Sequence, residues 1–137
     1  MSDDPSHFKP HPSHFTPEPR RDLGERSFNF ALRIVRVCQV LDDKPGIGRT
    51  LGKQLLRSGT SIGANIEEGF GAQSEADYLT KCSIACKEAR ETLYWLKLLG
   101  ASDILPENRL TELMQECDEL VAILTTIAKR LKVKRDA

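Results

Sequence analysis

The distribution of prolines is the strongest constraint on what this chain can fold into. Five of the seven prolines lie within the first nineteen residues, and the other two are Pro45 and Pro106. Because proline breaks the interior of a helix, long helices are possible only between these positions. Residues 1–21 are also rich in Ser and hold all three histidines. We therefore predict a disordered tail over 1–21, followed by one domain over 22–134.

Apolar side chains recur every three to four residues through the predicted domain, which is the period of a helix with one buried face. The pattern predicts an all-α domain, with helices over about 24–41, 48–68, 75–99 and from Pro106 onwards. The predicted N-caps are Asp22 and Ser74, and the predicted helix ends are Gly69, Gly71 and Gly100. Because the connections are short, we expect an up-down-up-down antiparallel four-helix bundle.

The second helix contains a run of small residues around Gly59 and Gly63. A glycine inside a helix costs about 1 kcal/mol relative to alanine. Such a run is tolerated where the backbone of another helix comes close. We therefore predict tight packing of a second helix at these two glycines.

The first helix carries two apolar stripes instead of one. The first stripe is Phe28, Ala31, Leu32, Val35 and Cys38, and the second is Phe30, Ile34, Val37 and Leu41. A bundle core needs only one stripe, so the other should face a partner subunit or an adjacent helix. On the third helix, Trp95 and Leu98 also lie to one side of the buried stripe. We predict an oligomer interface made by Phe30, Ile34, Val37, Trp95 and Leu98.

The net charge is zero, but its distribution is uneven. Residues 20–57 carry nine Lys and Arg against four acids, whereas residues 67–119 carry five against twelve. We predict a basic surface for RNA at Arg33, Arg36, Arg49, Lys53 and Arg57, through contacts to phosphates. The alternatives are a solvated face matched to the helix dipoles and a charged seam between like subunits.

Residue types typical of catalysis are scarce in the predicted bundle, which contains no histidine. The commonest general base, the usual hydrolytic triads and di-iron Glu-x-x-His motifs are therefore missing, and no phosphate loop follows a strand. The four cysteines form no CxxC pair and suit buried positions. A metal site at His7, His11 and His14 and an enzymatic pocket at Glu67, Glu68, Glu88 and Glu91 are weaker alternatives. We predict no enzyme activity, no cofactor and no metal.

The chain shows neither a secretory h-region nor an apolar run of the ~20 residues that span a bilayer. We expect a cytoplasmic protein with no membrane partner.

Two stretches resemble the bacterial 23S ribosomal RNA intervening sequence protein family. They are SIGANIEEG over 61–69 and KEARETLYWL over 87–96. The resemblance implies a four-helix bundle without enzymatic activity that assembles as a ring-like homopentamer. A related accessory factor of diversity-generating retroelements binds nucleic acid and a reverse transcriptase through a basic surface. Our leading hypothesis is thus an oligomeric bundle that binds RNA or a ribonucleoprotein, and the alternative is a protein–protein assembly module without nucleic-acid affinity.

Overall fold

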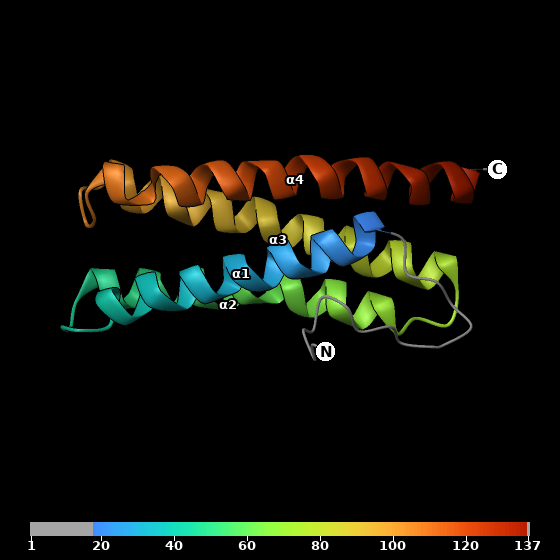
Figure 1. The fold of residues 1–137 in the computed structure, drawn as a ribbon. Helices are drawn as coiled ribbons and strands as arrows, with labels where there is room; N and C mark the ends of the chain where they lie inside the picture. Colours follow the sequence, from blue (N-terminus) through green and yellow to red (C-terminus); the bar gives the residue numbers. More distant parts are fainter. Residues whose placement is uncertain (1–17, 137) are drawn as a thin grey trace.

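The structure, a computed structural model, describes residues 18–136 as four antiparallel helices (Figure 1). The helices are α1 (Glu18–Leu41), α2 (Ile47–Phe70), α3 (Glu75–Ala101) and α4 (Glu107–Asp136). The chain passes up and down between them through short connections, as predicted from the apolar period. Among these described residues, no helix is both long and apolar enough to cross a membrane.

All four helices contribute to a single continuous core. The fully buried apolar side chains include Phe30 and Ile34 of α1, Leu55 and Ile62 of α2, Leu79 and Leu96 of α3, and Leu110 and Leu124 of α4. All four cysteines are buried, as predicted. Burial of these apolar side chains is the main stabilising contribution to the bundle.

The helices pack unevenly around the core. Each helix packs closely against the next one in the chain, but α1 meets α4 at far fewer positions. A fork of charged hydrogen bonds joins these two helices. Arg26 donates from Nε to Glu116 over 3.0 Å and from Nη2 to Glu116 and Glu119 over 2.8 Å each. The contact between α1 and α4 therefore depends more on polar interactions than the contacts between α1 and α2, α2 and α3, or α3 and α4.

The helix ends follow the sequence prediction at some positions and depart from it at others. Ser74 caps α3 as predicted, because its Oγ accepts a hydrogen bond of 3.1 Å from the backbone N–H of Asp77. The prediction for Asp22 is wrong: α1 already begins at Glu18, so Asp22 lies inside the helix. Residues 18–21 of the predicted tail are thus helical. The rest of the tail, 1–17, lies outside the described residues.

Glycines at two predicted helix ends serve close packing instead of a turn. The helix α2 continues past Gly69, which lies against the ring of Tyr78, and ends at Phe70. Gly71 follows with φ −93°, outside the left-handed region. Gly100 is buried within α3, and the left-handed residue after this helix is Asp103, with φ 60°.

Gly59 and Gly63 confirm the predicted close approach of a second helix, which is α1. A Cβ built on Gly59 would lie 2.9 Å from Cγ1 and Cγ2 of Ile34. A Cβ built on Gly63 would lie 3.3 Å from Oγ of Ser27. The small residues of α2 therefore set how closely α1 and α2 approach each other.

Candidate interaction surface

The five cations predicted to bind RNA lie on two helices that pack side by side, α1 and α2. Three of the five form ion pairs within the chain. Arg33 lies 3.7 Å from Glu112, and Nε of Arg49 lies 3.2 Å from Asp42. The third is Arg57, which pairs with two glutamates of α3.

Arg36 and Lys53 are exposed and form no ion pair with the described residues. The basic surface is therefore smaller than the sequence suggested. Of the five predicted positions, only these two present a cation that forms no ion pair with an acidic side chain of residues 18–136. A phosphate backbone would gain less from such a surface than from five free cations.

The ion pairs of Arg57 connect α2 to the aromatic part of α3. Arg57 donates to Glu88 over 3.2 Å and also to Glu91, and Nε1 of Trp95 donates to the same Glu91 over 3.0 Å. The hydrogen bond from Arg57 and then that from Trp95 hold the pKa of the Glu91 carboxyl below its ordinary value. The bond to Glu91 in turn raises the pKa of Arg57.

The glutamates of the weaker alternative, an enzymatic pocket on α2 and α3, are either in ion pairs or exposed. Glu88 and Glu91 bind Arg57, while Glu68 accepts a hydrogen bond of 2.7 Å from Lys81. Glu67 is exposed. Within residues 18–136, no group of three His, Cys, Asp or Glu side chains is arranged to hold a metal ion. The weaker alternative of a metal site at His7, His11 and His14 lies outside the described residues.

The predicted oligomer interface is wrong for two of its members. Phe30 and Ile34 are 1% and 0% exposed and belong to the core of the bundle. Val37, Trp95 and Leu98 are half-buried, and Val37 and Trp95 pack against the core. The stripe of α1 that we assigned to a partner therefore faces α2 and the rest of the bundle.

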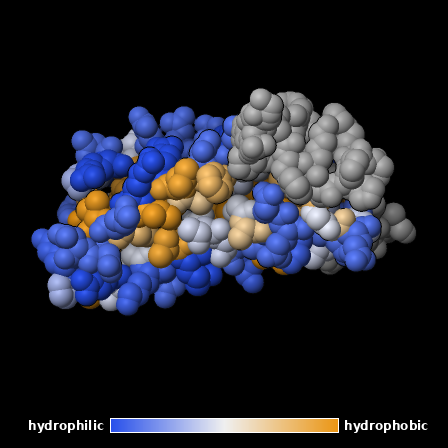
Figure 2. All heavy atoms as spheres, turned by 60° about the horizontal axis from the view of Figure 1, so that its bottom comes forward, coloured by the Kyte–Doolittle hydropathy of each residue, from blue (hydrophilic) through white to orange (hydrophobic). Residues whose placement is uncertain are grey.

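Most of the other stripe of α1 is exposed, although Cys38 at its end is buried. Phe28, Leu32 and Val35 are 56%, 41% and 37% exposed, and Leu56 of α2 is 39% exposed. We call these four residues the α1–α2 apolar face. Figure 2 shows hydrophobic atoms gathered on this side of the molecule, surrounded by hydrophilic ones. The sequence pattern contained this stripe, but α1 alone did not indicate which of its two stripes is exposed.

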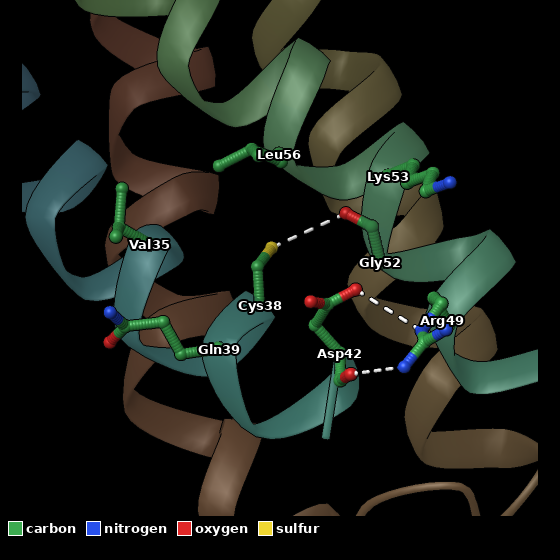
Figure 3. Close-up of a pocket in the computed structure, with 8 residues that line it drawn as sticks. All are labelled: Val35, Cys38, Gln39, Asp42, Arg49, Gly52, Lys53 and Leu56. Carbon is green, nitrogen blue, oxygen red and sulfur yellow. Dashed lines mark hydrogen bonds and ion pairs between the residues drawn. The ribbon is translucent and has the colours of Figure 1, made fainter. Parts of the chain in front are cut away.

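A groove of about 280 Å³ lies at one end of this face, between α1 and α2. It is lined by Val35, Cys38, Gln39, Asp42, Arg49, Gly52, Lys53 and Leu56 (Figure 3). The thiol of Cys38 donates to the carbonyl oxygen of Gly52 over 3.3 Å, which leaves the groove an apolar floor. Arg49 and Asp42 close one end by their ion pair, and Lys53 extends outwards from α2.

These features define the class of the protein: an antiparallel four-helix bundle with an exposed apolar face on its first helix pair. The family model described as 23S rRNA-intervening sequence protein matches residues 22–126, which include parts of all four helices. The chain belongs to this family, as its resemblance over 61–69 and 87–96 suggested.

A solved structure shows the same fold. It is the crystal structure of a protein of unknown function from the S23 ribosomal protein family of Bacteroides thetaiotaomicron VPI-5482. The two chains share 39% identity with a TM-score of 0.71, over 78% of this chain and 98% of that chain. No curated protein matches this chain.

Proposed function

We propose that this protein is a non-enzymatic helical module that assembles with further copies of itself through the α1–α2 apolar face. The observation that carries the proposal is the exposure of Phe28, Leu32, Val35 and Leu56 on one side of the bundle. Contiguous exposed apolar patches on a folded domain commonly mark interaction sites. The family resemblance favours a ring-like homopentamer as the assembled form.

The charge pattern supports self-association between unlike faces. The segment 20–57, which includes most of α1 and the first half of α2, is basic, and 67–119 is acidic. A contact between the α1–α2 side of one copy and the acidic side of the next would bring opposite charges together. Such head-to-tail contacts generate closed rings when the rotation between copies closes.

Light scattering coupled to size-exclusion chromatography tests this proposal. We expect an oligomer at micromolar concentration for the wild type and a monomer for Leu32→Glu, because the glutamate places a charge within the buried interface. Val133→Glu is the control: Val133 of α4 is 68% exposed and lies outside both the α1–α2 apolar face and the acidic segment 67–119. A monomeric wild type, or equal dissociation by both variants, would reject the proposal.

RNA binding is the second candidate function, and the free cations Arg36 and Lys53 favour it. The description of the family also refers to 23S rRNA. Reversing Arg49 or Arg57 would break ion pairs within the chain, so the double variant Arg36→Glu, Lys53→Glu is the cleaner probe. We expect it to lose binding to a 23S rRNA transcript in a low-salt gel-shift assay.

Lys97→Glu provides the control for this assay, because Lys97 is an exposed cation on α3. It should retain the RNA affinity of the wild type. If the wild type itself does not bind RNA at about 50 mM salt, where phosphate contacts are strong, RNA binding is excluded and assembly alone remains.

A further inference from the structure

The groove between α1 and α2 has the chemistry of a site for one apolar side chain. Val35 and Leu56 stand on its two walls, and Cys38 lies at its floor (Figure 3). Its volume of about 280 Å³ is slightly below the ~300–1,000 Å³ of typical small-molecule sites. A single aromatic ring on a peptide would suit this groove.

The groove lining carries Arg49 and Lys53 against Asp42, a net positive charge that favours an acidic peptide. Lys53 lies at the rim without an ion pair among the described residues, and α2 begins nearby at Ile47. This helix has no side-chain cap at Gly46 and no acidic residue in its first turn. The N-terminus of a helix carries a partial positive charge that acidic side chains stabilise.

Residues 1–17 of the chain itself combine aromatic side chains with nearby acidic residues. They include two Ser-His-Phe repeats, which end at Phe8 and Phe15, and a pair of acids at Asp3 and Asp4. Phe8 follows the acids by four to five residues, which is ~13–17 Å of extended chain. Leu56 lies nine residues after Ile47 in α2, which is ~13 Å of helix. The distance from the two acids to Phe8 therefore matches the distance from the start of α2 to Leu56.

The length of the segment allows Phe8, but not Phe15, to reach the groove. Val35 follows Glu18 by seventeen residues of continuous helix, which is ~25 Å. Phe8 precedes Glu18 by ten residues, which can span up to ~33–36 Å. Phe15 precedes it by only three, which can span ~10 Å. The two repeats thus have the same composition but different reach.

We propose that residues 3–8 bind this groove in the same chain, with Phe8 between Val35 and Leu56 and with Asp3 and Asp4 near Lys53 and the start of α2. The inference rests on the proposed function in one respect: the bound segment covers part of the α1–α2 apolar face. It therefore competes with a second copy for that face. The segment then sets the concentration at which the protein assembles.

Photo-crosslinking in the full chain tests the occupant directly. The probe is p-benzoyl-phenylalanine, placed at position 8 in one protein and at position 15 in another. After irradiation, denaturing electrophoresis separates crosslinks within one chain from crosslinks between chains, and mass spectrometry locates them. We expect position 8 to crosslink within one chain to residues 35–38 or 56, and position 15 to give no crosslink there.

Crosslinks from position 8 between chains, at another site, or not at all would overturn the proposal. The first of these results would assign the groove to the segment of a neighbouring copy. The crosslink does not depend on assembly, so it can succeed even if the wild type is monomeric and the proposed function fails. In an assembling protein, Phe8→Ala should also lower the concentration at half-assembly several-fold, whereas Phe15→Ala should leave it unchanged.

Discussion

Gly59 of α2 lies so close to Ile34 of α1 that a Cβ on the glycine would be 2.9 Å from two carbon atoms of the isoleucine side chain. Ile34 is fully buried and branched at Cβ, so it cannot move aside freely. The glycine thus leaves room for the Ile34 side chain in the core.

We expect Gly59→Ala to lower the free energy of unfolding by about 1–2 kcal/mol, since overpacking outweighs the gain in helix propensity. Urea denaturation measures this loss. In an Ile34→Ala background the same substitution should be neutral or stabilising, because the added methyl then fills space. Equal losses in both backgrounds would show that the contact with Ile34 is not the cause.

A buried pair of hydroxyl groups joins α2 to α3. Oγ1 of Thr92 lies 2.9 Å from Oγ of Ser58 and 2.8 Å from the carbonyl oxygen of Glu88. Both side chains are fully buried. Thr92→Val leaves the Ser58 hydroxyl with only its 3.4 Å contact to the carbonyl oxygen of Leu55.

We therefore expect Thr92→Val and Ser58→Ala each to cost about 1 kcal/mol, the usual range for a lost buried hydrogen bond. The double variant should cost clearly less than the sum, because it removes both polar partners together. Thermal and urea unfolding of the three variants give the coupling energy. Strictly additive losses would contradict an interaction between the two hydroxyls.

The four helices were predictable because the apolar period and the two interior prolines are local signals. The close approach at Gly59 was predictable for the same reason, since a costly glycine in a helix needs a packing explanation. The α1 residue that packs against Gly59 was not predictable, because its identity depends on which stripe of α1 turns towards α2. Phe28 and Phe30 differ little as local signals, yet one is 56% exposed and the other 1%.

The candidate site was only partly predictable for a similar reason. The sequence places Arg49, Lys53 and Arg57 one turn apart on α2. It does not show that the register of α3 brings Glu88 and Glu91 to Arg57. Charge counts along a chain cannot distinguish free cations from those paired across helices, and this distinction decides how strongly the surface attracts RNA.

The charged fork of Arg26 should contribute measurably to the weakly packed α1–α4 seam. The side chains of Arg26 and Glu116 are 27% and 23% exposed, and the hydrogen bond to Glu116 raises the pKa of Arg26. We expect Arg26→Gln to lower the free energy of unfolding by about 1 kcal/mol, allowing for solvent screening. The loss should shrink in 0.5 M NaCl.

Arg33→Gln is the matched control for this experiment on the same helix. Arg33 lies 3.7 Å from Glu112, whose side chain is 91% exposed. Its substitution should change stability by less than about 0.5 kcal/mol. If the two arginine variants lose the same stability at low salt, the fork at Arg26 has no special role in joining α1 to α4.

Two buried thiols should make the protein less stable at alkaline pH. Burial raises the pKa of Cys38 to about 11 and that of Cys117 to about 12. In the unfolded chain these thiols lose their protons near pH 8.5–9. Above that pH the unfolded state binds fewer protons than the folded state, so the free energy of unfolding falls as pH rises towards the folded pKa values.

Between its unfolded and its folded pKa, each thiol should lower the free energy of unfolding by about 1.4 kcal/mol per pH unit. Urea denaturation of wild type and Cys117→Ala at pH 8 and pH 10 isolates the contribution of Cys117 to the pH dependence of the free energy of unfolding. The difference in stability between them should shrink by about that amount per unit above pH 9. For Ile127→Val, which removes one buried methylene and no ionisable group, the loss relative to wild type should be equal at both pH values. A constant difference for Cys117→Ala would contradict the link between burial of this thiol and alkaline unfolding.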